Sequence, residues 1–347
     1  MIQSNWGKSS MLMGLLIALA GLMMVALYMG QIPVPATSVL HDLAARFGWE
    51  VAWGESLTPE QNAVLWYIRL PRICVAILVG SALAIAGAVM QGVFGNPLAD
   101  PGIIGVSAGA SFGAVIAVSL GLTSAGMFYM PSFAFLGAFA SVLLTISLTM
   151  RGGKIPTMSL LLAGVAVSML LGALTSGILT FMNEYRLKEF LFWMVGGLDY
   201  RRWEHVYLAI GPILVGMSIL CLLSRHLNVL VLGDIEAKAL GLPVVWYRIL
   251  FLGLASVVTA TAVCVSGSIG FVGLIVPHIM RLLIGPDHRL LLPGSALAGA
   301  LFLLFCDTLG RTIMPPTEIR VGIMTALLGA PYFLFLLRRM RRHGGAF

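Results

Sequence analysis

GIIGVSAGASFGAVIAVSLGLTSAGMFYMPSFAFLGAFASVLLTISLTM, residues 102–150, is a stretch without a single Asp, Glu, Lys or Arg. A soluble core does not require an uncharged run of this length, whereas the hydrocarbon layer of a bilayer takes about 20 apolar residues per helix. The stretch therefore holds two predicted spans, and Pro131 with the more polar segment 121–132 marks the turn between them. We predict a polytopic membrane protein.

The remainder of the chain has the same character. It is 59% hydrophobic and 10% charged, with a mean hydropathy of +0.98. Backbone groups inside a bilayer must be satisfied within their own segment, and these runs are apolar on every face, so we predict an all-α protein rather than a barrel. A chain of 347 residues with this composition leaves no room for a separate soluble catalytic domain. We interpret the net charge of +7 as basic residues that orient the chain in the membrane and contact lipid headgroups, rather than as a sign of nucleic acid binding.

Charge-free windows predict ten spans within a single transmembrane domain, residues 1–347. Residues 1–62 hold the first span and an external loop, 63–205 the second to fifth spans and an external loop, and 206–347 the remaining five spans with a cytoplasmic loop at 225–247. We interpret the first window as a retained span, because no signal-peptidase site follows it. The windows are 11–30, 73–95, two within 102–150, 155–182, 206–224, two between 249 and 284, 290–306 and 321–337.

Basic residues orient the predicted bundle. The cluster Arg338, Arg339, Arg341 and Arg342 is expected in the cytoplasm by the positive-inside rule, and ten spans then place the N-terminus there too. Ten spans divide into five plus five. An odd number per half makes the second half enter the membrane upside down, which is a recurring plan in transporters.

Three segments interrupt the apolar runs and are candidates for function. QGVFGNPLADPG, residues 91–102, breaks a helix with prolines and glycines, which a membrane tolerates only where the backbone lines a cavity or is buried in protein. LGDIEAKALGLP, residues 232–243, predicts a short amphipathic helix that suits docking into a groove on a partner. GFVGLIVPHIMR, residues 270–281, places His278 on an apolar helix, where packing is commoner than ligation. The alternatives are a plain turn for the first segment and a solvated loop helix for the second.

Several kinds of chemistry are missing from the sequence. No G-x-x-x-x-G-K-[ST] motif is present, so this chain is not expected to bind ATP by a P-loop. The four cysteines are far apart, which disfavours a disulfide or a metal site. The predicted spans contain almost no carboxylates, although proton- or sodium-coupled carriers usually need ionisable groups at mid-membrane. Asp307 comes closest, at the end of the ninth window. We therefore expect the energy source to lie on another chain.

Four segments in this order, 91–113, 233–242, 270–281 and 321–331, together resemble the FecCD-type permeases. These are the membrane subunits of ATP-binding-cassette (ABC) importers for ferric siderophores, haem and cobalamin, and the resemblance extends over residues 60–340. It implies a type II ABC importer permease with ten helices in two inverted five-helix halves. It also implies a homodimer in a bacterial inner membrane with both termini cytoplasmic, two copies of a separate ATPase subunit, and a periplasmic substrate-binding protein.

The resemblance also carries site residues over to this chain. In the family, a cytoplasmic segment couples to the ATPase, external arginines pair with carboxylates of the binding protein, and a further region closes the path on the inside. The matching positions are Asp234, Glu236 and Gly241 for coupling, Arg69, Arg72 and Arg311 for docking, and Asn96, Leu98 and Thr157 for the cytoplasmic gate. No catalytic residue, metal site or cofactor is expected.

The substrate stays open at this point. We expect haem or another iron chelate, because Ala99-Asp100-Pro101 is similar to the haem permeases, with cobalamin and ferric siderophores as alternatives. His41, His205, Tyr185 and Tyr200 are expected on the external side, where they could meet a metalloporphyrin. A membrane-embedded enzyme is a remote alternative. It would need His, Asp, Glu or Cys gathered at one membrane depth, and the sequence shows no such group.

Overall fold

The structure is a computed structural model, and it describes residues 5–30, 32, 34–46, 48, 56–150 and 152–342. Apolar helices form most of this part of the chain, as the sequence predicts. Seven of them are long and apolar enough to cross a membrane, and three are shorter. The ten are α1 (Asn5–Tyr28), α4 (Leu70–Phe94), α5 (Val106–Ser119), α6 (Tyr129–Thr149), α7 (Thr157–Thr180), α9 (Trp203–Leu222), α12 (Val244–Ser266), α13 (Val272–Ile284), α14 (His288–Thr312) and α15 (Val321–Arg342).

Short helices connect these spans. The π-helical turn η1 joins α3 to α4, so that one continuous helix runs over residues 59–94. The connecting elements are α2 (Ala36–Arg46), α3 (Pro59–Ala63), η1 (Val64–Arg69), η2 (Pro101–Ile104), η3 (Leu122–Ser124), α8 (Glu184–Met194), α10 (Ser224–Leu230) and α11 (Asp234–Ala239).

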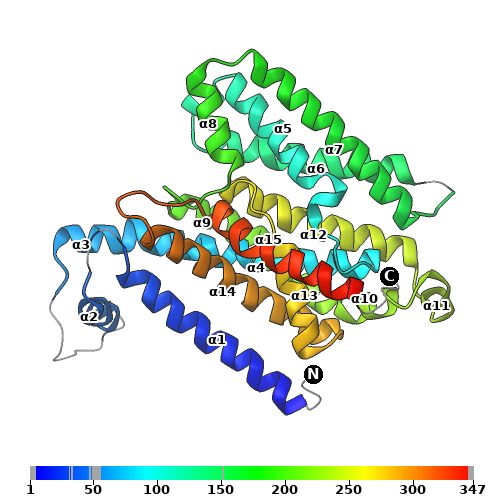
Figure 1. The fold of residues 1–347 in the computed structure, drawn as a ribbon, viewed down its shortest axis with the longest axis horizontal. Helices are drawn as coiled ribbons and strands as arrows, with labels where there is room; N and C mark the ends of the chain where they lie inside the picture. Colours follow the sequence, from blue (N-terminus) through cyan, green and yellow to red (C-terminus); the bar gives the residue numbers. More distant parts are fainter. Residues whose placement is uncertain are drawn as a thin grey trace.

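Successive apolar helices run back and forth along one axis of the bundle (Figure 1). One end carries α3, α8 and the loop before α15, and we call it the α8 face. The opposite end carries α10, α11 and the starts of α7 and α12, and we call it the α11 face. Because the number of crossings is even, α1 begins and α15 ends at the α11 face (Figure 1).

The two halves of the chain pack in a matching way, as inverted repeats predict. The second span, α4, packs on the ninth, α14, and the seventh span, α12, packs on the fourth, α6. Exchanging the halves converts one pair into the other. An irregular segment also precedes both the third and the eighth span: η2 lies before α5, and residues 267–271 lie before α13.

Several predicted boundaries need correction. The ninth span continues to Thr312, so Asp307 lies inside α14 and not at its end. The seventh span begins at Val244, before the predicted window, and the eighth has only 13 residues. Charge-free windows place these ends wrongly because a helix continues through charged residues whose long side chains reach the interface or pair with one another.

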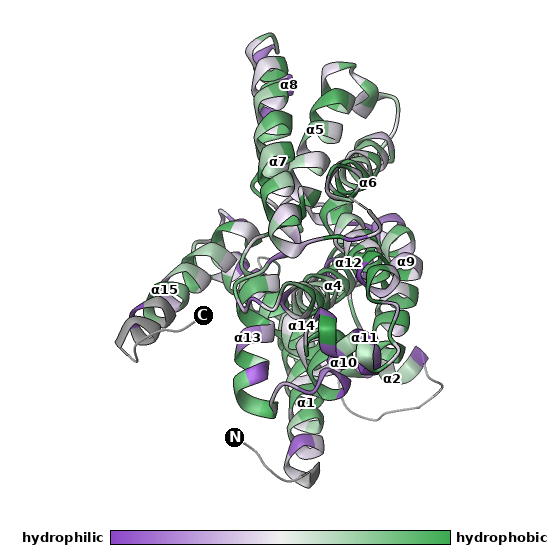
Figure 2. Ribbon diagram, turned by 90° about the vertical axis from the view of Figure 1, so that its right-hand side faces the viewer, coloured by the Kyte–Doolittle hydropathy of each residue, from purple (hydrophilic) through white to green (hydrophobic). Residues whose placement is uncertain are grey.

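The central helix of the bundle is α4. Of the most apolar stretch in the continuous helix 59–94, 83% is buried inside the chain, compared with 17% for α1 and for α7. The neighbours of α4 are α14, α12, α13 and α9. The long helices are hydrophobic along most of their length, and hydrophilic residues gather mainly near their ends and in the connections (Figure 2). The helix surfaces that pack around α4 are therefore as apolar as the surfaces that face the lipid.

Glycine allows α4 to approach its neighbours. Between membrane helices the hydrophobic drive is weak, so association depends on close van der Waals packing of small residues. Gly80 of α4 and Gly299 of α14 each lie against the other's carbonyl oxygen, and Gly87 lies against the backbone of Gly273 in α13. A side-chain carbon at any of these positions would overlap backbone atoms. The α4 contacts are therefore made by backbone meeting backbone.

Gly87→Ala tests this packing. The new methyl group would overlap the backbone of Gly273, and overpacking of this kind costs about 1–3 kcal/mol of unfolding free energy. Gly253→Ala on α12 is the matched control, because a methyl group there meets no atom within 4 Å. The free energy of unfolding can be measured in mixed micelles by titration with a denaturing detergent. Equal stability of the two variants would contradict the glycine contact.

Candidate functional site

Arg72 and Asp307 form a buried ion pair at the α8 face. Arg72 lies in the first turn of α4 and Asp307 lies within the C-terminal part of α14, so the packing of these two helices brings them together. Nε of Arg72 donates to both carboxylate oxygens, at 3.0 and 3.1 Å, and Nη2 donates to Oδ1 at 2.9 Å. The side chains are 8% and 1% exposed. Such multidentate pairs fix the orientation of both groups as well as attracting them.

Two further carboxylates approach Arg72 from the loops. Glu318, before α15, accepts a hydrogen bond from Nη1 at 2.7 Å, and Asp199, between α8 and α9, lies 3.6 Å from Nη2. Asp199 also pairs with Arg320 at 3.3 Å, and the Arg320 guanidinium lies 4.6 Å from the ring centroid of Phe192. One charge cluster thus joins the start of α4, the loop between α8 and α9, and the end of α14 with the loop that follows it.

Arg311 and Arg69 hold the end of α1. Nε of Arg311 lies 3.4 Å from Asp307, and its amino groups donate to carbonyls of α1 and the residue after it. Arg69, in the π-helical turn, donates to carbonyls at the same place. The last carbonyls of a helix have no partner within the helix and favour cations, so the two guanidiniums cap α1. The acceptors are Ala26 and Met29 for Arg311, and Leu27, Tyr28 and Ile32 for Arg69.

The structure brings the three predicted docking arginines to one face. Arg69, Arg72 and Arg311 are 3%, 7% and 5% exposed, and this chain itself supplies carboxylates and carbonyls to balance them. An acidic partner is therefore not needed to explain their position near the membrane, and their direct contact with a binding protein stays a prediction. Sequence reasoning missed Asp199 and Glu318. The contact between Arg72 and Glu318 spans 246 positions, which no local spacing reports.

An open hollow of about 700 Å³ lies over this cluster. Tyr67 and Tyr200 are 69% and 90% exposed at its edge. Tyr200 has a φ of +57°, a left-handed conformation that is uncommon outside glycine and occurs often at functional sites. Guanidiniums and aromatic rings together suit a planar anionic group. The lining residues are Tyr67, Ile68, Arg72, Phe192, Asp199, Tyr200, Arg201, Arg202, Pro316, Glu318 and Arg320.

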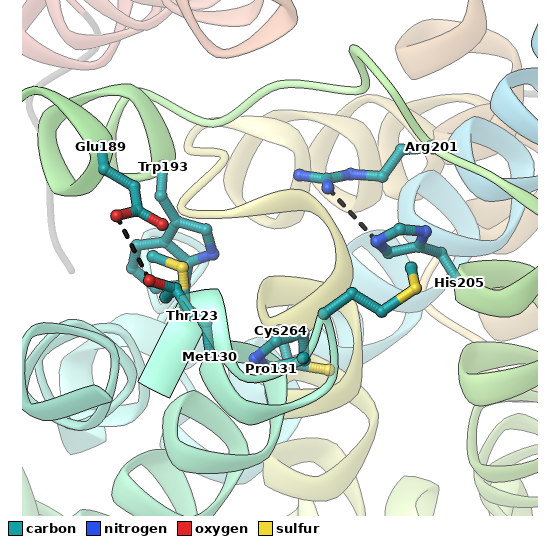
Figure 3. Close-up of a pocket in the computed structure, with 10 residues that line it drawn as sticks. Thr123, Met130, Pro131, Glu189, Trp193, Arg201, His205 and Cys264 are labelled. Atoms are coloured by element: carbon teal, nitrogen blue, oxygen red, sulfur yellow. Dashed lines mark hydrogen bonds between the residues drawn. The ribbon is translucent and has the colours of Figure 1, made fainter. Parts of the chain in front are cut away.

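A smaller pocket of about 150 Å³ lies on the same face (Figure 3). Glu189 stands on one side of it, and Arg201 and His205 stand on the other (Figure 3). Nδ1 of His205 accepts from the main-chain N–H of Arg202 at 3.2 Å, and Nε2 lies 3.5 Å from Arg201. Burial lowers the pKa of Arg201 to about 10, so the group remains a cation at neutral pH. His205 is therefore engaged within the chain, whereas Tyr185 is 79% exposed.

The predicted coupling segment is a separate helix at the α11 face. The helix α11 ends at Ala239, and Gly241 in the turn after it has a φ of +81°, which is readily available only to glycine. Ala237 is fully buried, whereas Ile235 and Leu240 are 80% and 65% exposed. Glu236 is on the exposed surface. Apolar side chains displayed beside an acidic group mark a surface that a partner can cover.

Asp234 holds α11 to the bundle through Arg248, a residue that sequence reasoning did not assign. Nη2 of Arg248 donates to Oδ1 of Asp234 at 2.6 Å, and Nη1 donates to Oδ2 at 3.3 Å. Nη1 also donates to the carbonyl of Ile155, just before α7, at 2.9 Å. The hydrogen bonds from Arg248 hold the pKa of Asp234 below its usual range. The ion pair is therefore complete at neutral pH and is lost only as acid protonates the carboxylate.

The predicted gate residues lie in the breaks at the α11 face. Asn96 accepts a hydrogen bond from the main-chain N–H of Leu98 at 2.9 Å, which closes a tight turn after α4. Thr157 is the first residue of α7. Further along, Gly164 of α7 lies against the carbonyl of Ile103 in η2. The broken segment and α7 are thus packed together, and closure of a path by these residues stays a prediction.

Comparisons with known proteins agree with this arrangement. The profile of the FecCD transport family matches residues 15–339. The chain belongs to the FecCD transport family. It is 44% identical to a cobalamin import system permease protein of Halobacterium salinarum over 310 residues, which cover 89% of this chain and 80% of that protein. It is 43% identical to a hemin transport system permease protein of Yersinia pestis over 290 residues, 81% of this chain and 86% of that protein.

A solved structure shares the fold. It is described as an inward-facing conformation of a metal-chelate type ABC transporter, and it superposes with a TM-score of 0.84 at 34% identity. The match covers 95% of this chain and 99% of the other. The chain is therefore an all-α polytopic transport protein. In the residues that the structure describes, no group of three or more His, Cys, Asp or Glu side chains could hold a metal ion.

Asp307→Asn tests how much the charge cluster contributes to the free energy of unfolding. The change leaves Arg72 and Arg311 facing a neutral group in a buried site, and breaking a buried pair costs about 3–5 kcal/mol of unfolding free energy. Glu318→Gln is the control, because that carboxylate is 29% exposed and solvent screens its charge more than it screens the buried charge of Asp307. If the two single variants lose equal stability in detergent titration, the buried pair is not dominant.

Proposed function

We propose that the chain is the membrane permease subunit of an ABC importer that moves a metal chelate, with haem as the leading substrate, from periplasm to cytoplasm. The observation that carries the proposal is the placement of two unlike surfaces at opposite ends of one apolar bundle. A charged, hollowed surface lies at the α8 face, and a short helix with exposed apolar side chains lies at the α11 face. Relatives named as cobalamin and hemin permeases support this reading.

The ATPase would dock at the α11 face. A surface helix with exposed apolar side chains suits insertion into a groove of a second protein. The sequence lacks a P-loop, so ATP hydrolysis belongs to that second protein. Asp234, Glu236 and Gly241 form the coupling element in this proposal, and one ATPase copy would serve each permease. The α11 face is then cytoplasmic, with both termini inside a bacterial inner membrane.

A second copy of the chain would complete the path. Only 17% of the most apolar stretch of α7 is buried inside the chain, so most of this helix must face lipid or another subunit. A two-fold axis is the commonest symmetry of soluble oligomers, and it would set two identical α7 helices on opposite sides of one path. Asn96, Leu98 and Thr157 would narrow that path at the α11 face. Cysteines at these positions whose reactivity does not change with nucleotide would contradict a gate.

The periplasmic binding protein would dock at the α8 face. Arg69, Arg72 and Arg311 are buried there, and they would shape and charge the surface while more exposed cations such as Arg202 meet the partner first. Charges at the rim of an interface mainly change the association rate and its salt dependence. The docking protein would therefore present acidic groups to this face.

The identity of the transported chelate is the most specific part of the proposal. Haem carries two carboxylates on a planar aromatic macrocycle, and the hollow at the α8 face offers arginines and exposed tyrosines. Cobalamin is the alternative favoured by the name of one relative, which is 44% identical. A ferric siderophore is the third member of the class.

Substrate-stimulated ATP hydrolysis distinguishes these substrates. The permease is reconstituted in nanodiscs with its ATPase and its binding protein, and ferric haem, cobalamin and a ferric hydroxamate are compared. We expect haem to stimulate hydrolysis above the rate with the empty binding protein. Stimulation by cobalamin alone would show that cobalamin and not haem is the substrate, and the proposed transport function would stand. Failure of every chelate to stimulate hydrolysis in an assembled complex would contradict the proposal.

Charge reversal at the rim is the second arm of this test. Arg202→Glu should slow association of the binding protein by about tenfold at low salt, because rim charges steer the encounter. The difference should shrink at high salt, where exposed charges are screened. Arg225→Glu is the control, because it is an exposed cation at the α11 face. Equal association rates for the two variants would place docking elsewhere.

A further inference from the structure

We propose that Arg248 is a positioning residue that ties the coupling helix α11 to the start of α7, so that movement of α11 is passed to the inner closure. The inference rests on the proposed function, which makes α11 the ATPase contact. It assigns a transmission role to a residue on a third helix, α12, that the proposed function leaves without one. The residue touches neither substrate nor ATPase in this account, and it acts through the two segments that it holds.

The contacts of one guanidinium make the connection. Arg248 grips the Asp234 carboxylate with both amino groups, at 2.6 and 3.3 Å, and donates to the carbonyl of Ile155 at 2.9 Å. Asp234 is the first residue of α11, and Ile155 lies two residues before α7 begins. The positions that meet at Arg248 are separated from it by 14 and by 93 residues. The guanidinium of Arg248, which is rigid and planar, therefore connects α12, the start of α11 and the segment before α7.

The two partners of this ion pair differ in burial: the Arg248 side is held in place, and the Asp234 side is accessible to a partner protein. The side chain of Arg248 is 5% exposed, whereas that of Asp234 is 52% exposed. Ile155 is 1% exposed. A guanidinium loses little freedom for each hydrogen bond, because its planar fork is preorganised. A displacement of the exposed carboxylate by a docked partner would pull on a buried group that has little room to rotate independently.

The surroundings of the joint favour transmission through Arg248. The elements that pack on α11 are α10 and α12. A hollow of about 510 Å³ lies between the loop before α7 and the coupling loop, lined by residues 152–154 on one side and by Lys238 and residues 242–246 on the other. Where the segments are separated by such a space, backbone packing does not lock them together. The buried guanidinium of Arg248 contacts both segments, through Ile155 and Asp234, and joins them.

Lysine at this position separates charge from geometry. Arg248→Lys keeps the cation, but a single ammonium cannot reproduce the fork that holds the carboxylate and the carbonyl together. Asp234→Asn keeps the shape of the acid and removes its charge. Each variant keeps a polar group at the substituted position, so both are expected to fold even if Arg248→Ala does not. Arg225→Lys, on the exposed surface of α10, is the matched control.

The first measurement is the number of substrate molecules transported per ATP hydrolysed in proteoliposomes that contain ATPase and binding protein. Arg248→Lys should lower this ratio by about tenfold, the size of an ordinary coupling between two sites, while ATPase affinity for the permease stays unchanged, and Asp234→Asn should also lower the ratio. Arg225→Lys should leave both quantities unchanged. A ratio equal to wild type in both variants overturns the inference. Loss of ATPase affinity in step with transport also overturns it, because Arg248 would then serve docking.

The second measurement does not depend on transport. Spin labels at Lys154→Cys and Lys238→Cys, in a background with the four native cysteines replaced by alanine, report the distance across the hollow. With Arg248 in place the distance distribution should be narrow in each nucleotide state, and Arg248→Lys should broaden it. An unchanged distance distribution in Arg248→Lys would contradict the proposed positioning role of Arg248. If the wild-type permease binds no ATPase at all, the proposed function fails instead, and the two failures are thereby distinguished.

Discussion

The fold depends on the close approach of α4 to its neighbours. Lipid tails are as apolar as leucine, so helices in a bilayer do not gain by hiding apolar side chains from water, and they associate through contact and through polar groups. Gly80 meets Gly299 and Gly87 meets Gly273, backbone against backbone, with no space for a side chain. These contacts place α14 and α13 around one buried helix. The helices α14 and α12, which carry Asp307, Arg311 and Arg248, both pack directly on α4.

Polar contacts then select the arrangement at each end of the bundle. The pair of Arg72 and Asp307 can form only when α4 and α14 have the observed register, because both side chains are almost completely buried. Pairs of this kind are costly to break but contribute little against a well-packed apolar alternative, so their value lies in fixing geometry. At the α11 face Arg248 is also buried, although its partner Asp234 is 52% exposed. A buried guanidinium at each end of the bundle joins segments that are separate in the sequence.

The sequence predicts the architecture well, because the bilayer imposes a simple rule. Charge-free windows located ten apolar helices, and the break at 91–102 and the helix at 234–239 were found from glycine, proline and charge. The family resemblance, carried by four motifs, was confirmed by the match over residues 15–339. Helix ends were less accurate, because α14 continues through Asp307 and Arg311.

The partners of the charged side chains could not be predicted. Arg69, Arg72 and Arg311 were expected to pair with carboxylates of a binding protein, because the matching positions do so in the family that the sequence resembles. Arg72 meets Asp307 from 235 positions away and Glu318 from 246, and such contacts depend on helix packing that no local pattern reports. Arg248 was unassigned for the same reason. A weak signal existed for Asp307, a lone carboxylate in an apolar run, because a charge in such a place requires a partner.

The most direct test of the account is the energy source of uptake. The purified chain, its ATPase and its binding protein are placed in sealed proteoliposomes, and accumulation of labelled chelate is followed with either ATP or a proton gradient as the only driving force. We predict uptake with ATP, its complete loss when the P-loop lysine of the ATPase is replaced, and no uptake with the gradient. Uptake driven by the gradient in vesicles that contain this chain alone would contradict the account.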